Sequence, residues 1–246
     1  MSAPPTTQPD DGDNRERDDH VDQHERGVAH IDGATAVGVL LAAGAGTRFD
    51  GATHKLLAVL PATASRPAET VAARSLAAAA TAASRPPFVG LVVVTGAVDL
   101  GGHLLAAHGA GHAARAATPS LVHNEHWEDG QAGSVRLGVD AARRLGADVV
   151  VIGLADQPDV TVESWLAVAD AATAPGARPI AVATYGGRPR NPVALHRQVW
   201  NELPATGDTG ARDLIRLSPS RVTQVPSRGS PADIDTVEDL ARWQNS

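Results

Sequence analysis

The chain has 246 residues, of which 43% are hydrophobic, and it contains no cysteine. This length and composition allow one large α/β domain with a substantial core, and they exclude disulfide bonds, thiolate metal sites and a cysteine nucleophile. The N-terminus has no apolar segment of a secretion signal, and no apolar run approaches the roughly 20 residues of a membrane span. A chain without cysteine also suits a reducing compartment. We therefore expect a cytoplasmic protein without a membrane partner.

The net charge of −7 is distributed unevenly along the chain. Residues 1–34 contain nine acidic residues and three arginines, a balance of −6, so the remainder carries only −1. A nearly neutral domain offers no basic surface, and nucleic-acid binding is not expected. The first segment is also rich in Pro, Asp and Gln and poor in large apolar side chains. We therefore predict a disordered acidic tail over residues 1–34 and a single domain over residues 35–246.

The domain is predicted to begin with a buried strand over residues 37–43 that runs into a glycine turn. The strand is apolar and without breakers, as in a parallel sheet covered on both faces. Gly44 and Gly46 permit positive φ and leave the backbone N–H groups of the turn open to an anion. Arg48 can hold phosphate oxygens in a bidentate fork, and Lys55, the only lysine of the chain, supplies a mobile charge. The pattern predicts a phosphate-binding turn, with a solvated surface charge as the alternative for Lys55.

Helices and strands are predicted to alternate over the rest of the chain. Alanine-rich segments indicate helices, and apolar runs bounded by Gly, Pro or Asp indicate strands. The predicted helices are residues 69–83, 99–108, 135–145 and 161–172, one opening at 207–212 and one within 233–240; the predicted strands are residues 88–96, 120–123, 148–155, 179–185, 192–195 and 221–225. This alternation predicts a Rossmann-like, three-layer α/β/α fold around a mostly parallel sheet.

A polar, glycine-bearing loop over residues 124–134 leads into the helix predicted to start at residue 135. A loop of this kind at a helix N-terminus offers unpaired N–H donors to an anion or a base. The alternative is that Ser134 only caps the helix. Trp127 belongs either to the core or to the wall of such a site.

Carboxylates follow or precede predicted elements at three positions of interest. Asp156 comes directly after the strand over residues 148–155, where open α/β sheets bind ligands, and it suits Mg²⁺, a hard cation that prefers oxygen ligands. The alternative is that Asp156 only begins the turn fixed by Pro158. Asp233 and Asp235 lie on one face if their segment is extended, and one of them is a candidate second metal ligand.

Two further polar segments occur between predicted elements. Arg188 and Arg190 belong to a rigid, basic turn and either grip a substrate anion or lie exposed on a hairpin. The segment over residues 207–212 opens a helix, for which Asp208 or Thr209 is the expected cap.

Six segments, in chain order, together resemble a known family. They are residues 41–49 (LAAGAGTRF), 55–58 (KLLA), 154–158 (LADQP), 187–188 with 191–193 (GR and NPV), 207–212 (GDTGAR) and 233–236 (DIDT). The set spans almost all of residues 37–241 and resembles the MobA-like nucleotidyltransferase family, most closely its MocA-like branch of molybdenum cofactor cytidylyltransferases. The resemblance implies the nucleotide-diphospho-sugar transferase type of the three-layer fold.

The resemblance also implies a site for CTP and a divalent metal. The implied nucleotide-binding residues are Leu41, Ala42, Ala43, Gly44, Ala45, Gly46, Thr47, Arg48, Lys55, Gly130 and Ser134. Arg48, Lys55 and Asp156 are the implied catalytic residues, because the two cations neutralise the triphosphate and the carboxylate holds Mg²⁺. Asp235, in preference to Asp233, is the implied second carboxylate on the metal.

The implied reaction is in-line attack by a phosphate oxygen of an acceptor on the α-phosphorus of the nucleotide, with release of pyrophosphate. Such chemistry needs positioning and charge neutralisation more than a proton-transfer residue. Ala43 stands where guanylyl-transferring relatives usually carry glycine, so the resemblance favours CTP. The implied acceptor is a molybdopterin-type phosphate bound by Gln157, Arg188, Asn191 and Asp208, and the implied protein partner is a molybdoenzyme or its chaperone. The loop over residues 50–54 is longer than usual in the family, which leaves the reach of Lys55 open.

Three other functions stay open on the sequence alone. A GTP- or sugar-phosphate-type nucleotidyltransferase has the same fold. An NAD(P)-dependent oxidoreductase shares the Gly-Ala-Gly turn after a strand, but its fingerprint needs a third glycine where this chain has Phe49. A non-catalytic nucleotide- or cofactor-binding relative is the third, and the presence of Arg48, Lys55, Asp156 and Asp235 argues against it.

Overall fold

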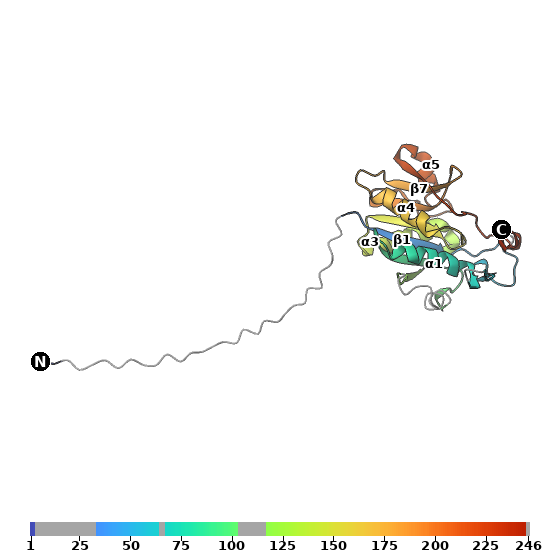
Figure 1. The fold of residues 1–246 in the computed structure, drawn as a ribbon, viewed down its shortest axis with the longest axis horizontal. Coiled ribbons are helices and arrows are strands. Elements are labelled where there is room, and N and C mark those ends of the chain that lie inside the picture. Colours follow the sequence, from blue (N-terminus) through green and yellow to red (C-terminus); the bar gives the residue numbers. More distant parts are fainter. Residues whose placement is uncertain (3–32, 64–66, 103–116, 245–246) are drawn as a thin grey trace. The chain divides into compact units, whose positions relative to one another are not determined.

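The computed structural model describes residues 1–2, 33–63, 67–102 and 117–244 (Figure 1). Contacts between residues define a compact unit from Ile31 to Ser246, which contains every helix and strand of the described chain. Almost all of the tail predicted over residues 1–34 lies outside the described residues, and so does most of the helix predicted over residues 99–108. No helix within the described ranges is both long and apolar enough to cross a membrane.

A seven-stranded sheet forms the centre of the described chain. Its strands, in spatial order, are β5 (Ser120–His123), β4 (Phe88–Thr95), β1 (Ala36–Ala42), β6 (Val149–Leu154), β8 (Arg188–His196), β7 (Ile180–Tyr185) and β9 (Val222–Pro226). Neighbouring strands are parallel except around β8, which runs antiparallel to both β6 and β7. The mostly parallel sheet predicted from the sequence is confirmed.

Helices cover both faces of this sheet (Figure 1). On one face, α1 (Val71–Ala83) and α4 (Val162–Thr173) contribute to an apolar cluster in which Trp165 is buried. On the other face, α3 (Gln131–Arg144) contributes to a second cluster through side chains such as Val139. Burial of apolar side chains in two clusters, one on each side of the strands, gives the three layers that the sequence predicts.

Short helices and strands connect the layers. They are η1 (Lys55–Leu57), β2 (Val59–Leu60), β3 (Glu69–Thr70), η2 (Trp127–Asp129), η3 (Arg197–Glu202), α5 (Arg212–Leu217), η4 (Pro219–Arg221) and α6 (Val237–Gln244). The spacing of Thr236 and Asp239 predicts a capping box for α6, and the structure has one. The Thr236 hydroxyl accepts from the Asp239 N–H at 3.1 Å, and Asp239 Oδ2 accepts from the Thr236 N–H at 2.8 Å. This cap fixes the chain next to Asp235.

The carboxyl ends of the central strands meet at one edge of the sheet, which we name the carboxyl edge. β1 and β6 lie side by side with Leu41 paired to Leu154, and the Ala155 N–H donates to the Leu41 carbonyl at 2.9 Å. β8 starts at the same edge because it runs opposite to β6. Residues that follow β1 and β6 therefore meet residues that begin β8, at the place where open α/β sheets bind ligands.

The start of α3 differs from the prediction. The helix begins at Gln131 instead of residue 135, and its N-cap is Gly130, so the alternative that Ser134 only caps the helix is wrong. Gly130 has φ +100, and a Cβ on it would lie 2.6 Å from the carbonyl group of Gly207. A glycine begins this helix because neither the backbone conformation nor the space admits a side chain.

The basic turn before residue 192 is also shorter than predicted. Only Gly186 and Gly187, with φ of 56 and 77, make the reversal, and β8 already begins at Arg188. Arg188 pairs with Tyr185 and Arg190 with Ala183, and the β7–β8 register shifts just beyond these pairs, between Ala183 and Val182. The two arginines therefore lie on a strand, where register decides their positions.

The helix opening at residues 207–212 lacks its predicted cap. α5 begins at Arg212 after an N-cap at Ala211, with no side-chain capping hydrogen bond. The carbonyl of Thr209 accepts from the Arg212 N–H at 2.8 Å, so a backbone turn starts the helix. The expectation that Asp208 or Thr209 caps α5 is wrong.

Candidate active site

The glycine turn after β1 forms one wall of a cavity at the carboxyl edge. Gly46 has φ +62, and its carbonyl accepts from the Phe49 N–H at 2.9 Å. A Cβ on Gly46 would lie 3.0 Å from His54 Nε2 and 3.1 Å from Lys55 Cγ, so the turn packs closely on the segment that carries Lys55. We name this space, of about 500 Å³, the first cavity. Its lining residues are Leu41, Ala42, Ala43, Gly44, Ala45, Gly46, Thr47, Arg48, Lys55, Leu56, Trp127, Glu128, Gly130, Gln131, Ser134, Leu154, Asp156, Asp208 and Asp235.

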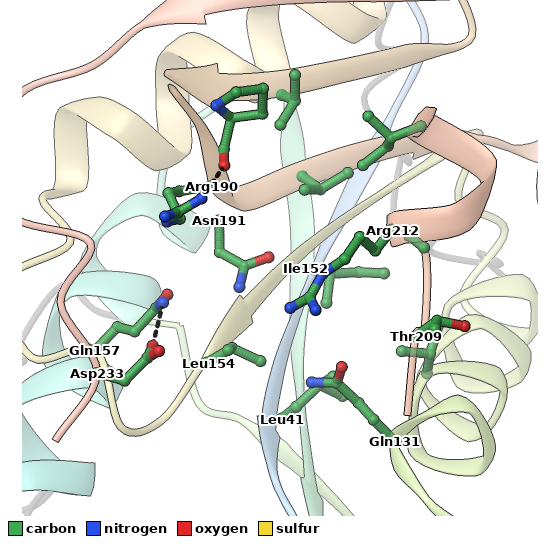
Figure 2. A pocket seen from close by; sticks show the side chains of 16 residues that line it. Leu41, Gln131, Ile152, Leu154, Gln157, Arg190, Asn191, Thr209, Arg212 and Asp233 are labelled. Atoms are coloured by element: carbon green, nitrogen blue, oxygen red, sulfur yellow. Dashed lines mark hydrogen bonds between the residues drawn. The ribbon is translucent and has the colours of Figure 1, made fainter. Parts of the chain in front are cut away.

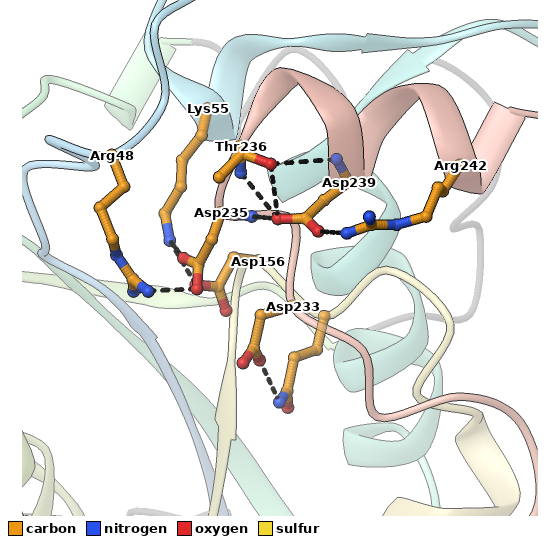
Figure 3. Close-up of polar contacts among 9 residues, drawn as sticks. Arg48, Lys55, Asp156, Asp233, Asp235, Thr236, Asp239 and Arg242 are labelled. Carbon is orange, nitrogen blue, oxygen red and sulfur yellow. Dashed lines mark hydrogen bonds and ion pairs between the residues drawn. The ribbon is translucent and has the colours of Figure 1, made fainter.

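Lys55 lies in the first cavity between two carboxylates (Figure 3). Its Nζ is 2.6 Å from Asp156 Oδ2 and 2.7 Å from Asp235 Oδ1. Arg48, whose side chain is 74% exposed, places Nη2 2.8 Å from Asp235 Oδ2. Asp156 follows β6 and Asp235 precedes α6, so tertiary structure joins segments that are far apart in the sequence. The loop over residues 50–54 does not prevent Lys55 from reaching this cluster.

The cluster balances its own charges. Burial of Lys55 disfavours its charged form, but the carboxylates of Asp156 and Asp235 outweigh that effect and raise the pKa of the ammonium above its ordinary value. Lys55 is therefore a cation throughout the neutral pH range. Because two carboxylates already face Lys55 and Arg48, an anionic ligand needs an additional cation to keep the cavity close to neutral.

Asp156 and Asp235 fit such a cation. Oδ1 of Asp156 is buried and has no hydrogen-bond partner among the described residues, so this oxygen is open to a metal. Carboxylate oxygens are ligands that hard divalent cations prefer. In the part of the chain that the structure describes, no group of three or more His, Cys, Asp or Glu side chains could hold a metal alone. The two carboxylates would share the metal with phosphate oxygens or water, as is usual for Mg²⁺.

Asp233 forms no ion pair with Lys55 or Arg48. Its Oδ1 accepts from Gln157 Nε2, and both side chains line a second cavity (Figure 2). Burial, reinforced by the negative charge of Asp156, raises the pKa of Asp233 above its ordinary value. Of the two carboxylates that the sequence left open as metal ligands, Asp235 is the one that contacts Lys55.

The start of α3 closes another side of the first cavity. Ser134 lies buried in the first turn of the helix, where its hydroxyl accepts from Asn124 Nδ2 at 2.9 Å. The Ala132 N–H donates to the Gly207 carbonyl at 2.9 Å, so one of the N-terminal donors of the helix already has a partner. Gly130 and Ser134 both line the cavity, as the resemblance implies.

The second cavity, of about 530 Å³, opens beside the first. The two cavities share the side chains of Leu41, Gln131 and Leu154. The other lining residues are Val135, Ile152, Gln157, Val182, Pro189, Arg190, Asn191, Val193, Thr209, Ala211, Arg212, Ile215 and Asp233. The walls combine apolar side chains with polar ones, and Arg190 and Arg212 bring two positive charges and Asp233 one carboxyl group to them (Figure 2). Arg190 Nη1 donates to the Pro189 carbonyl at 2.9 Å, whereas the Arg212 guanidinium has no hydrogen bond or ion pair with any described residue.

The residues expected to bind the acceptor are divided between the cavities. Gln157 and Asn191 line the second cavity. Asp208 instead lines the first cavity, and Arg188 is absent from the lining of both. Arg190 and Arg212 supply the positive charge of the second cavity in place of Arg188.

Comparison of the sequence with known proteins identifies the family of this chain. Residues 38–225 match the model of the MobA-like NTP transferase domain. The purine catabolism protein PucB of Bacillus subtilis (strain 168) is 35% identical over 116 residues, which are 46% of this chain and 55% of PucB. The chain thus spans about half the length of this relative.

Solved structures share nearly the whole fold. Rv0371c from Mycobacterium tuberculosis H37Rv is 27% identical, with a TM-score of 0.65 over 87% of this chain and 98% of that chain. Its complex with manganese aligns at 24% identity, with a TM-score of 0.62 over 87% of this chain and 100% of that chain. A nucleotidyl transferase from Methanothermobacter thermautotroptrophicus, Mth528, aligns at 21% identity, with a TM-score of 0.64 over 86% of this chain and 96% of that chain.

These likenesses confirm the nucleotide-diphospho-sugar transferase type of fold. Since the family model matches well over half of the chain, the protein belongs to the MobA-like NTP transferase family, a family of nucleotidyltransferases.

Proposed function

We propose that the protein transfers CMP from CTP to a phosphate-bearing small molecule, in a reaction that requires a divalent metal and releases pyrophosphate. The observation that carries this proposal is the cluster of Lys55, Asp156 and Asp235 beside the glycine turn, at the carboxyl ends of adjacent parallel strands. A metal–triphosphate complex needs cations for its phosphates and carboxylates for its metal. The cluster contains both.

The first cavity is the proposed site of CTP. Its glycine turn offers backbone N–H groups to the triphosphate, and Arg48 and Lys55 neutralise the phosphate charge. The ribose and base lie toward Gly130 and Ser134 at the start of α3, with Trp127 as a wall. A volume of about 500 Å³ is ample for a ligand of this class.

Mg²⁺ is the proposed metal, and Asp156 and Asp235 are its proposed protein ligands. The open Oδ1 of Asp156 supports this assignment. A bound metal supplies charge neutralisation at the phosphate oxygens. The manganese complex of Rv0371c, a relative with this fold, is consistent with a divalent metal.

Ala43 supports CTP over GTP through the resemblance, because guanylyl-transferring relatives usually carry glycine at this position. Ala43 lines the first cavity, and its wall is tightly packed, because a Cβ on Gly96 would lie 2.9 Å from the Ala43 Cβ and 2.6 Å from its carbonyl oxygen. GTP and sugar-phosphate chemistry on this fold are the alternatives that the binding experiment below separates.

The second cavity is the proposed site of the acceptor, for which a molybdopterin-type phosphate is the leading candidate. Apolar side chains such as Ile152 and Val193 suit the organic body of a ligand, and Arg190 and Arg212 suit anionic groups. Gln157 and Asn191 provide amide hydrogen bonds, and the buried Gln157 Oε1 has no partner among the described residues. We further propose a cytoplasmic reaction whose product passes to a molybdoenzyme or its chaperone.

We place the transfer of CMP at the wall that the two cavities share, where the acceptor phosphate can meet the α-phosphorus of CTP. An acceptor phosphate oxygen attacks the α-phosphorus, a new P–O bond forms, and the bond between the α-phosphorus and the bridging oxygen breaks. Pyrophosphate leaves with the electron pair of that bond. Lys55 and Arg48 stabilise the charge on the phosphates, and no protein group has to move a proton because the attacking phosphate oxygen is already deprotonated.

A nucleotide screen tests the proposal. The purified protein is titrated with CTP, GTP, ATP and NADPH, with and without Mg²⁺, and pyrophosphate release is followed with a molybdopterin-type acceptor. We expect CTP to bind most tightly, with affinity that depends on Mg²⁺, and pyrophosphate to appear only with the acceptor present. Preferential binding of NADPH would contradict the assignment as a transferase. Tighter binding of GTP would contradict CTP as the nucleotide. Binding that does not depend on the metal would contradict the assignment of Asp156 and Asp235 as metal ligands.

A further inference from the structure

His54 uses both ring nitrogens to join two segments of the first cavity. Nδ1 accepts a hydrogen bond from the Leu56 N–H at 3.2 Å, and this bond caps η1, the helix that carries Lys55. Nε2 lies 3.1 Å from the carbonyl oxygen of Gly44, in the glycine turn ten residues earlier. The ring therefore bridges the turn and the helix.

These two partners determine the protonation of the ring. A backbone N–H can only donate, so Nδ1 must be unprotonated to accept from Leu56. A carbonyl oxygen can only accept, so Nε2 must carry the proton that it donates to Gly44. His54 is thus neutral and in its Nε2–H tautomer. An imidazolium would set an Nδ1–H against the Leu56 N–H and lose the cap.

The backbone at Gly46 packs closely against His54 and Lys55, at the place where the glycine turn meets η1. Gly46 has φ +62, and a Cβ on it would lie 3.0 Å from His54 Nε2. The turn therefore packs closely against both the histidine ring and the Lys55 stem.

We propose that His54 is a positioning residue, which holds the glycine turn in register with Lys55 so that both meet the same triphosphate. This inference rests on the proposed nucleotide site. His54 does not line the first cavity, and it acts through Gly44 and Lys55 instead of touching the ligand. It also explains how the long loop over residues 50–54 still delivers Lys55 to Asp156, because the end of that loop is tied back to the turn.

The electrostatic setting keeps the ring neutral. Burial lowers the pKa of His54 below its ordinary value, the charge of Lys55 reinforces this effect, and the carbonyls of Gly44 and Ala45 oppose it. Of the described charged side chains, Lys55 is the one whose field acts on the ring. The two hydrogen bonds of His54 therefore persist at neutral pH, and they are lost on acidification below the usual pKa range of histidine.

His54→Asn and His54→Ala separate the two hydrogen bonds. An Asn side-chain oxygen can replace Nδ1 as a cap for the Leu56 N–H, but the shorter side chain cannot reach Gly44. Ala removes both bonds. His196 provides a matched control, because its Nδ1 caps η3 in the same way, by accepting from the Gln198 N–H at 3.3 Å. His196 pairs with Val149 at the opposite end of β6 from Asp156, so it is remote from the site.

The first measurement is the Kd of CTP with Mg²⁺, together with Tm. We expect His54→Asn to weaken binding at least about fivefold with little change in Tm, because the turn loses its register with Lys55. His54→Ala should weaken binding as much and also lower Tm. His196→Asn and His196→Ala should leave the Kd unchanged. Binding by His54→Asn equal to that of the wild type would reduce His54 to a helix cap and overturn the proposal.

Two readouts do not depend on the nucleotide assignment. Nitrogen-15 correlation spectra of the wild-type imidazole should show the Nε2–H tautomer, and amide exchange at Gly44 and Gly46 should accelerate in His54→Asn but not in His196→Asn. An Nδ1–H tautomer or unchanged exchange would refute the junction even if CTP binds. Conversely, a wild-type protein that binds no nucleotide while showing both signatures would refute the proposed function and leave the junction standing.

Acidification provides a third readout of the same bond. The wild-type affinity for CTP should fall as the ring takes up a proton, whereas the profile of His54→Asn should lack this component. Protonation of the nucleotide phosphates affects both proteins equally and cancels in the ratio of their Kd values. A ratio that stays constant with pH would contradict the role of the neutral ring.

Discussion

The two cavities at the carboxyl edge are similar in volume, but they differ in whether their positively charged side chains have ionic partners in the protein. In the first cavity, Lys55 is held between two carboxylates within 2.6–2.7 Å, so its cation is compensated before any ligand arrives. In the second, the guanidinium of Arg212 has no ionic partner among the described residues. Under the proposed function, the first cavity suits a ligand that brings a metal with its phosphates, and the second suits one that brings only anionic charge.

This difference predicts different sensitivities to substitution. In the first cavity the groups are partly buried and mutually dependent, so removing one leaves another without its partner, which is costly. In the second cavity an arginine can be removed without leaving a protein group unpaired, so only binding of the ligand suffers. Three substitutions test this contrast, and the expected effects decrease from the first cavity to the second.

Asp156→Asn should have the largest effect. The amide removes a proposed metal ligand and half of the negative charge that faces Lys55, so we expect turnover to fall by about 10³-fold or more. The change is close to isosteric and Lys55 keeps Asp235 as an ionic partner, so Tm should remain near that of the wild type. Asp140→Asn, which alters an exposed carboxylate paired with Arg143 on α3, is the matched control and should leave turnover unchanged. Activity within a few fold of the wild type would remove Asp156 from the metal site.

Lys55→Met should have the next largest effect, and it should act on stability as well as on rate. The methionine leaves Asp156 without its cation and Asp235 with only the exposed Arg48, which should lower the free energy of unfolding by about 1–3 kcal/mol in urea titrations. Turnover should fall by about 10²-fold, because a triphosphate loses a neutralising charge. Added Mg²⁺ should restore part of the lost stability by replacing the missing positive charge. If stability and rate both match the wild type, Lys55 is a surface charge, as the alternative from the sequence holds.

The sequence predicts the first cavity well because its parts lie in short segments next to regular elements. The glycine turn directly follows β1 and Asp156 directly follows β6, so the parallel arrangement alone brings them to one edge. The start of α3 could not be predicted in this way. Gly130 begins the helix because the Gly207 carbonyl group lies 2.6 Å from where its Cβ would be, and that contact joins segments nearly 80 residues apart. Ser134, which local pattern favours as a cap, is instead buried against Asn124.

The second cavity was harder to predict because register and tertiary packing decide its lining. Arg188 and Arg190 look equivalent in the sequence, but Arg188 lies at the start of β8, paired with Tyr185 beside the reversal, and Arg190 lies two residues further into the strand. Only Arg190 reaches the cavity. Arg212 begins α5, and local pattern indicates a helix there without indicating which side chain faces the acceptor. The local sequence pattern does not indicate which of two nearby arginines lines a cavity that strands and a helix from distant segments form together.

Arg212→Gln should have the smallest effect and should act on the acceptor alone. Loss of one charge-assisted hydrogen bond should raise the KM of the acceptor by about tenfold. The Kd of CTP and the Tm should stay at their wild-type values, because Arg212 has no ionic partner among the described residues and does not line the first cavity.

Arg188→Gln is the control that makes this result specific. It removes the same charge from an exposed arginine that lines neither cavity, so the KM of the acceptor should not change. If both substitutions raise KM equally, the acceptor responds to the general positive charge of this edge and not to the second cavity. If Arg212→Gln weakens CTP binding instead, the two cavities are not independent, and the contrast between a compensated nucleotide site and an uncompensated acceptor site fails.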